Sequence, residues 1–240
     1  IFKKMKSLII NFLSILDYFI QKKNLIIFKK FFKKKINVYI DIGSHKGEMI
    51  NVIKKNFDVK YIFAFEPNIE CSKFLKIIKH KNIKIFNYAL SDKTGNDELK
   101  IGHISAMSTL NKINDNSLYT LIKKIVISVF FFKNEIYKKK IKIEKKMFKE
   151  IFKKYSYKTL DLVKIDTEGH EYNVLKGMGV YLKKINVILL EYHYDNSLIK
   201  DYNLKELNSF LKKKNFELVS KNKMLMRKGY EIIYKNKDII

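Results

Sequence analysis

Residues 37–47, NVYIDIGSHKG, are the stretch from which the rest of the chain can be interpreted. Their β-branched and aromatic start predicts a buried strand over 37–42, and two glycines, Gly43 and Gly47, follow it. Residues 49–57 then place apolar side chains at helical spacing. A strand that passes through a glycine turn into a helix presents N–H groups to an anionic ligand. The glycine spacing differs from the G-x-G-x-x-G fingerprint of dinucleotide-binding folds.

Outward from this stretch, short apolar runs alternate with helix-period segments, which is typical of a doubly wound, mostly parallel sheet. A final helix and two further strands follow, and these strands could pair as an antiparallel hairpin at the sheet edge. We therefore predict an α/β fold with seven strands. The further strands are predicted over 61–66, 83–89, 162–166, 187–192, 216–220 and 230–234, and the further helices over 74–78 and 204–211.

Two additions to this sheet are predicted. Residues 1–36 form an amphipathic helical extension, because Leu8, Phe12, Ile15 and Phe19 recur at helical spacing; an in-plane membrane anchor is the alternative interpretation. Within the main domain, residues 37–240, we predict a helical insertion over 102–156, before the fourth strand. It is expected to cover the carboxyl ends of the strands and to select the substrate, or else only to cap apolar surface.

Composition narrows the class of protein. A hydrophobic fraction of 47% argues against global disorder, and no apolar run approaches the roughly 18 residues of a spanning helix. A single cysteine, Cys71, permits no intrachain disulfide, so we predict a reducing, cytoplasmic location. The net charge of +26 suggests a nucleic-acid or anionic-membrane partner. Arg227 is the only arginine, however, so compositional bias toward lysine on solvated faces also explains the charge.

Polar residues follow three of the predicted strands. Glu66 ends the second strand, where a carboxylate can accept hydrogen bonds from the hydroxyls of a ribose. Residues 89–92 end the third strand and could border an adenine ring. After the fourth strand come Asp166 and Glu168, and period-two geometry places Glu191 and His193 on one face of the next strand. Charged groups at buried strand ends are costly unless they bind or catalyse, so we expect them to converge in one crevice.

These motifs, in this order, resemble the FkbM-type S-adenosylmethionine-dependent methyltransferases over residues 38–193. The resemblance implies a class I methyltransferase (Rossmann-like) fold with S-adenosylmethionine as cofactor. It implies that Asp41, Gly43 and Gly47 lie around the methionine part of the cofactor. It also implies that Glu66 binds the ribose and that residues 90–92 lie near the adenine. The cofactor-binding residues that we predict are Asp41, Gly43, Ser44, Gly47, Glu66, Pro67, Leu90, Ser91, Asp92 and Asp166. The motifs that carry the resemblance are Asp41-x-Gly43-x-x-x-Gly47, Phe65-Glu66-Pro67, Ala89-Leu90-Ser91-Asp92, Lys164-Ile165-Asp166-x-Glu168-Gly169-x-Glu171 with Leu175-x-Gly177, and Glu191.

Methyl transfer to an alcohol benefits from a general base. We predict that Asp166 or His193 takes the hydroxyl proton while Glu168 and Glu191 orient the substrate; the alternative is that the histidine only hydrogen-bonds the acids. We predict no metal, although Asp166, Glu168 and Glu191 offer the oxygen ligands that Mg²⁺ prefers.

Members of the family look like O-methyltransferases of sugars, glycans or polyketide-type metabolites. We therefore predict methylation of a hydroxyl on such an acceptor, free or lipid-linked, in polysaccharide biosynthesis. An RNA methyltransferase is one alternative, which the single arginine and the lack of an evident RNA-binding domain disfavour. A non-catalytic relative that binds a glycan or a membrane is the other. The basic N-terminal helix could hold the protein at the inner membrane face. The oligomeric state is left open.

Overall fold

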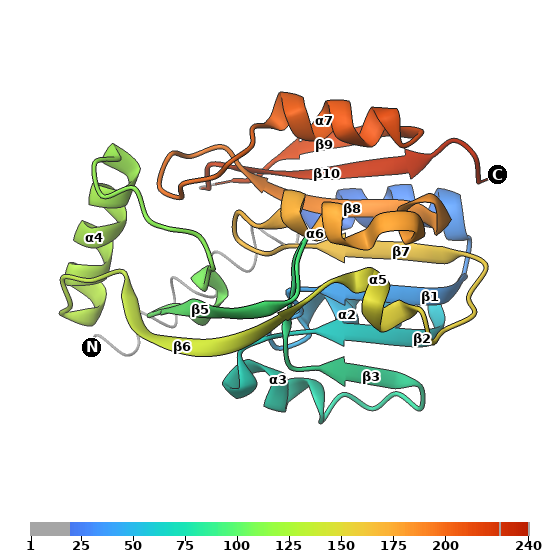
Figure 1. Cartoon of the computed structure of the whole chain (residues 1–240), viewed down its shortest axis with the longest axis horizontal. Helices are drawn as coiled ribbons and strands as arrows, with labels where there is room; N and C mark the ends of the chain where they lie inside the picture. The colour runs from blue at the N-terminus through green and yellow to red at the C-terminus, as the bar shows by residue number, and fades with distance from the viewer. Residues whose placement is uncertain (1–19, 226, 240) are drawn as a thin grey trace.

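A computed structural model of the chain describes residues 20–225 and 227–239. At its centre lies a seven-stranded sheet in the order β3-β2-β1-β7-β8-β10-β9 (Figure 1). Neighbours are parallel from β3 to β8, whereas β10 is antiparallel to both β8 and β9. The predicted mostly parallel sheet with an antiparallel edge hairpin is thus confirmed. The strands are β1 (Lys35–Ile42), β2 (Asp58–Phe65), β3 (Ile83–Phe86), β7 (Leu160–Ile165), β8 (Ile185–His193), β9 (Phe216–Lys223) and β10 (Gly229–Asn236).

Helices cover both faces of this sheet. A helix over residues 20–32 packs with α2 (Glu48–Asn56) and α3 (Ile69–Leu75) on one face. The other face is covered by α5 (Phe148–Phe152), α6 (Glu171–Met178), the 3₁₀ helix η2 (Gly179–Lys184) and α7 (Leu204–Lys213). The inner strands are buried on both sides, which is why they read as continuous apolar runs rather than as alternating patterns. Along β1, for example, Tyr39 and Ile40 face opposite core clusters and neither is exposed.

The chain winds in opposite directions on the two sides of β1, because β2 and β7 both pair with it. In open α/β sheets such a reversal separates the loops on either side and leaves a crevice beyond the carboxyl ends of the strands. A ligand site is therefore expected beyond β1, β2, β7 and β8.

The region between β3 and β7 differs from the prediction of a helical insertion. It contains a second sheet of order β4-β6-β5, built from β4 (Ala89–Leu90), β5 (Gly95–Gly102) and β6 (Tyr137–Lys146). The lysine-rich residues of β6 alternate with Ile141 and Ile143, which pack against Leu99 and Ile101 of β5. Within residues 102–156, the expected helix is found at α4 (Leu118–Phe131), at the short α5 and at the short 3₁₀ helix η1 (Ser105–Met107). Figure 1 shows α4 beyond the carboxyl ends of the parallel strands.

The N-terminal extension is described only in part. Leu8, Phe12, Ile15 and Phe19, on which its prediction depends, lie outside the described residues. In the helix over 20–32, Phe28 and Phe32 are buried against the sheet. Across residues 20–225 and 227–239, none of the helices combines the length and the apolar character that crossing a bilayer requires.

Candidate active site

A cavity of about 610 Å³ lies at the carboxyl ends of the parallel strands, within the size range of small-molecule sites. Its walls combine the turns after β1 and β2, the end of β3, the turn after β7, and β8. The region between β3 and β7 closes it through residues around η1 and on α4. Among the residues that line it are Gly43, Ser44, Glu66, Pro67, Tyr88, Leu90, Ile104, Val126, Phe130, Asp166, Glu168 and Glu191.

The glycine turn after β1 packs closely on neighbouring elements. Gly43 has φ +75°, and a Cβ there would lie 1.8 Å from the backbone oxygen of Asp166. Gly47, with φ +86°, would bring a Cβ to 2.4 Å from Ile78 Cδ1. The space that a side chain of Gly43 would take is occupied by the backbone that follows β7. Gly43 and Ser44 still line the cavity, whereas Gly47 lies behind it and allows α2 to pack against the segment after α3.

Glu66 stands at the end of β2 on the cavity wall and is only 7% exposed. Its two carboxylate oxygens accept the backbone N–H groups of His45 and Asn68, each at 2.8 Å. Burial raises the pKa of Glu66, and these two hydrogen bonds oppose that rise. A carboxylate oxygen has two lone pairs, so each can accept a further hydrogen bond from a hydroxyl. Beside Pro67 and Leu90, this carboxylate fits the ribose of an adenosine-type cofactor.

Besides Gly47, three predicted cofactor residues lie away from the cavity. Asp41 is fully buried beneath it, where its carboxylate accepts a hydrogen bond from the Tyr39 hydroxyl (3.0 Å). Ser91 Oγ contacts His170 Nε2 at 2.9 Å, and Asp92 pairs with Lys176 at 3.3 Å. These contacts tie residues 91 and 92 to the start and the last turn of α6. The prediction that Asp41, Ser91 and Asp92 contact the cofactor is therefore not supported by their positions.

Acidic side chains form the opposite wall of the cavity. Asp166 and Glu168 follow β7, and Glu191 projects from β8. Burial raises the pKa of Asp166, and the nearby Glu191 raises it further, against the influence of Lys164. Burial likewise raises the pKa of Glu168. These groups thus hold protons more tightly than exposed carboxylates, which suits a group that must accept a proton near neutral pH.

Lys164 joins the two walls. Its Nζ donates a hydrogen bond to the Gly43 carbonyl (2.8 Å) and lies 3.1 Å from Asp166 and 3.4 Å from Asp41. Burial alone would lower the pKa of Lys164, but these two carboxylates hold it above its ordinary value. The lysine therefore stays charged and offsets two buried acids that would otherwise be costly.

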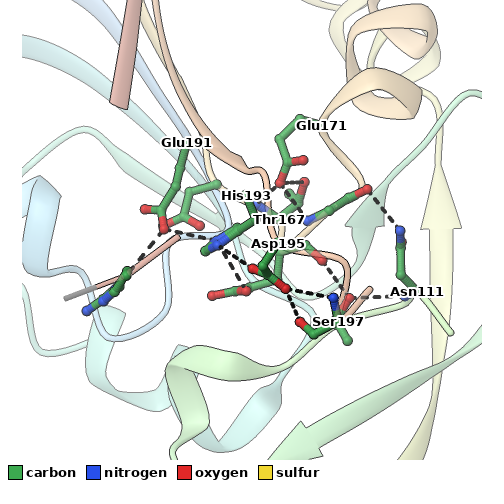
Figure 2. Close-up of polar contacts among 12 residues, drawn as sticks. Asn111, Thr167, Glu171, Glu191, His193, Asp195 and Ser197 are labelled. Atoms are coloured by element: carbon green, nitrogen blue, oxygen red, sulfur yellow. Dashed lines mark hydrogen bonds and ion pairs between the residues drawn. The ribbon is translucent and has the colours of Figure 1, made fainter. Parts of the chain in front are cut away.

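His193 occupies a different role from the one predicted. Its Nε2 lies 3.1 Å from Glu191 and 3.3 Å from Glu168, and its Nδ1 is 3.8 Å from Asp195 (Figure 2). Burial lowers the pKa of His193, but the two glutamates outweigh burial and raise it to about 10. The ring is therefore protonated near neutral pH and cannot accept a substrate proton. The contacts of His193 favour the alternative, in which it only binds the acids, over the prediction of His193 as general base.

The turn that carries Glu168 is strained and firmly held. Glu168 has φ +50°, which is uncommon for a residue with a side chain. Its backbone oxygen accepts a hydrogen bond from Thr109 (2.6 Å), and the next carbonyl accepts one from Asn111 (3.0 Å), so the segment after β5 fixes this turn. From the start of α6, the buried Glu171 carboxylate accepts hydrogen bonds from N–H groups of the same turn (Figure 2). Strain of this kind persists where the surroundings impose it, often at functional sites.

A metal could in principle be held here by a different set from the one considered. Glu168, Glu191 and His193 each offer one ligand atom, and these atoms lie within 4.8 Å of one another. Asp166, the third ligand in the sequence-based alternative, is tied to Lys164 instead. In this arrangement the protonated His193 ring already supplies positive charge between the two glutamates.

Sequence reasoning missed several residues that build the site. Lys164 belongs to one of the motifs that carry the family resemblance, but we predicted no role for it. A lysine within an otherwise apolar strand indicates that a buried acidic partner lies nearby. Thr109 and Asn111 come from a segment more than fifty residues before the turn they fix, and no local pattern marks them. Asp195 could have been noticed, because it continues the period-two series of Glu191 and His193.

The comparisons with known proteins agree with this architecture. The sequence profile of the FkbM methyltransferase domain matches residues 41–218. A crystal structure of an FkbM methyltransferase from Methylobacillus flagellatus KT has a similar fold, with TM-score 0.52 and 12% identity, over 83% of this chain and 43% of that one. The chain therefore spans less than half the length of that protein. Magnesium protoporphyrin IX methyltransferase from Synechocystis PCC 6803, solved with bound S-adenosylmethionine, matches with TM-score 0.47 and 6% identity over 93% of this chain and 77% of that one.

Among curated proteins, none matches the sequence significantly. The profile match covers well over half of the chain and begins at Asp41, where the glycine turn begins. The chain therefore belongs to the FkbM family of S-adenosylmethionine-dependent methyltransferases.

Proposed function

We propose that the protein transfers a methyl group to a hydroxyl of a sugar, a glycan or a related secondary metabolite. The observation that carries this proposal is the acidic wall formed by Asp166, Glu168 and Glu191. Carboxylates accept hydrogen bonds from hydroxyl groups, and neighbouring carboxylates are suited to an acceptor that carries several hydroxyls. A carboxylate whose pKa is raised by burial can also remove the proton of the hydroxyl that is methylated.

The opposite wall would hold the cofactor. Glu66 would bind the ribose hydroxyls, the apolar surface of Tyr88 and Leu90 the adenine, and the turn at Gly43 and Ser44 the methionine part. S-adenosylmethionine supplies a methyl group bound to a positively charged sulfur. Glu66 and the acidic wall make the cavity electronegative, which favours binding of that positive charge. The side chains of the two walls would then act mainly by holding the acceptor oxygen in line with this methyl group.

Asp166 is the residue that we assign as general base. Its side chain is 28% exposed, against 16% for Glu168 and 11% for Glu191, so it is the most accessible of the three. Glu168 and Glu191 both contact the His193 ring, which occupies part of their hydrogen-bonding capacity and holds them in place. We assign them the binding of acceptor hydroxyls. His193 is a positioning residue in this scheme.

The acidic wall argues against RNA as the acceptor. Three carboxylates beside the position of the reacting group would repel a polyphosphate backbone, whatever the overall charge of the surface. We therefore keep RNA methylation only as an outcome to be tested through the salt dependence of binding.

The test of the proposal is Asp166→Asn, which removes the base and keeps the shape of the side chain. We expect methyl transfer to a panel of sugar and glycan acceptors to fall by about 10²- to 10⁴-fold. Calorimetric binding of S-adenosylmethionine should weaken far less than methyl transfer. The matched control is Asp58→Asn at the amino end of β2, which should transfer methyl groups like the unaltered protein. Full activity of Asp166→Asn would show that Asp166 is not the general base. Methyl transfer to RNA but to no sugar or glycan would overturn the proposed function.

A further inference from the structure

Helix α4 carries an apolar stripe that faces away from the protein. Leu118, Leu121, Ile122, Ile125 and Val129 recur at spacings of three and four residues and therefore share one helix face. Each of the five is between 45% and 72% exposed. Scattered exposed apolar residues are ordinary, but a continuous stripe along a helix indicates a surface that something covers.

The remaining faces of α4 are already used by the protein. Thr120 and Ile127, opposite the stripe, are buried, which attaches the helix to the domain. Between these two faces, Val126 and Phe130 line the cavity. The helix thus has one face on the domain, one at the cavity and one that is apolar and exposed. A partner bound to the stripe would lie next to the cavity.

The charge around α4 is strongly positive. Residues 118–142 contain seven lysines and one glutamate. Surface pairs engage three of the lysines, with Asp115, Glu70 and Glu98. Among the others, Lys133 lies just beyond the C-cap of α4 and Lys138 is the second residue of β6, and both are exposed. An apolar stripe flanked by lysines is the pattern of a helix that lies in the surface of an anionic membrane.

We propose that α4 docks the protein on an anionic lipid surface, with the stripe among the acyl chains and the flanking lysines at the headgroups. A second copy of the chain is a poorer occupant, because it would bring one lysine-rich surface against another. Docking through α4 would place the cavity at the membrane, where a lipid-linked acceptor could enter it. That consequence for the acceptor rests on the proposed function, whereas the docking itself does not.

The test is co-sedimentation of the full chain with two kinds of vesicle, phosphatidylcholine alone and equal parts of phosphatidylcholine and phosphatidylglycerol. We expect binding to the anionic vesicles and little binding to the neutral ones. The variant Leu121→Glu/Ile125→Glu should bind the anionic vesicles at least about tenfold more weakly, because two apolar contacts are lost and two negative charges gained. Both side chains are more than half exposed, so the fold should be retained.

The matched control is Ile77→Glu/Val180→Glu, which makes the same charge change at two positions that are 74% and 72% exposed and lie outside α4. This control should lose much less binding than the α4 variant; equal losses would mean that charge alone matters and would overturn the proposal. A second comparison is Leu8→Glu/Phe12→Glu. If only this variant loses binding, the N-terminal segment and not α4 contacts the membrane. A dimer that the α4 variant converts to a monomer would equally overturn the proposal, and so would failure of the unaltered protein to bind anionic vesicles.

Binding of S-adenosylmethionine is measured on the same samples. Loss of vesicle binding with unchanged cofactor binding separates docking from the methyltransferase site. Failure of the docking proposal would then leave the proposed function intact.

Discussion

The two walls of the cavity are held in place by different kinds of contact. On the cofactor wall, backbone geometry dominates: Gly43 turns with a positive φ against the end of β7, and Glu66 is fixed by two backbone N–H groups. On the acidic wall, side-chain charges dominate, since His193 lies between Glu168 and Glu191. Backbone geometry tolerates almost no added atoms, whereas a charge network responds to pH and to the loss of single partners.

This difference agrees with what each wall has to do. A fixed turn suits a cofactor that stays the same in every reaction cycle. A network of charged side chains can be altered by a few substitutions, and the adjoining β5 to α4 region can change with it. Relatives that act on different acceptors would therefore be expected to differ on the acidic wall first.

The largest effect is expected from Gly43→Ala. Its Cβ would lie 1.8 Å from the Asp166 backbone oxygen, in a backbone conformation that L side chains rarely adopt. We expect a loss of about 3 kcal/mol or more in the free energy of unfolding, together with loss of cofactor binding. Gly95→Ala is the control: its φ is also positive, at +154°, but nothing lies within 4 Å of the added Cβ. Similar losses in the two variants, measured by denaturant unfolding, would show that close packing is not what fixes the turn.

Glu66→Gln should have the next largest effect, on affinity rather than stability. The amide keeps one acceptor oxygen but places an NH₂ group against a backbone N–H that now donates to the carboxylate. We expect S-adenosylmethionine to bind about 10- to 100-fold more weakly in calorimetry. Glu70→Gln, an exposed glutamate four residues away, should bind the cofactor normally. Unchanged affinity in Glu66→Gln would place the ribose elsewhere.

A smaller effect is expected from His193 on the acidic wall, and it concerns how the free energy of unfolding changes with pH. The pKa of His193 is about 10 in the folded protein and about 6.5 when unfolded, so the stability that this proton contributes is fully present only below pH 6.5. Stability should fall as the pH rises toward 10, with a slope from this group of up to about 1.4 kcal/mol per pH unit. In His193→Gln this contribution disappears, so unfolding curves between pH 7 and pH 9 should depend less on pH.

The control for this experiment is His80→Gln, whose ring contacts the carbonyl of Val59. That variant should keep the slope of the unaltered protein. An equal slope in His193→Gln and the unaltered protein would mean that the ring carries no proton in the fold.

The smallest effect is expected from removal of divalent metal ions. His193 already provides the positive charge between Glu168 and Glu191, so chelation should change neither methyl transfer nor cofactor binding by more than about twofold. Activity before and after treatment with EDTA, and after addition of Mg²⁺ or Mn²⁺, measures this. Activity that chelation abolishes and one of the two ions restores would show that a cation takes the place of the His193 proton.

Most of the fold could be predicted from the sequence, and several residues of both cavity walls could be named from it. Strand runs such as residues 61–65 are visible because burial on both faces leaves only apolar side chains. By contrast, β6 was mistaken for part of a helical region, although Lys140, Ile141, Lys142 and Ile143 alternate with a period of two. The abundance of lysine throughout the chain makes that alternation hard to distinguish from a lysine-rich solvated segment.

The functional residues divide in the same way. Glu66 and Gly43 could be identified because local motifs carry them. The role of His193 could not, because its protonation depends on Glu168, which belongs to another strand end. The family resemblance places Ser91 and Asp92 at the adenine, yet their side chains contact His170, at the start of α6, and Lys176, in its last turn. Contacts between distant segments decide these roles, and a single sequence does not display them.

Lys164 makes the two walls thermodynamically dependent on each other. It contacts the carbonyl of Gly43 on one side and the carboxylate of Asp166 on the other. If cofactor binding moves the turn at Gly43, the position of Lys164 changes, and with it the proton affinity of Asp166, which we assign as general base. By linkage, if the bound cofactor shifts the proton affinity of Asp166, protonation of Asp166 must shift the cofactor affinity by the same factor. The buried Lys164 would thus couple the affinity for the cofactor to the proton affinity of Asp166.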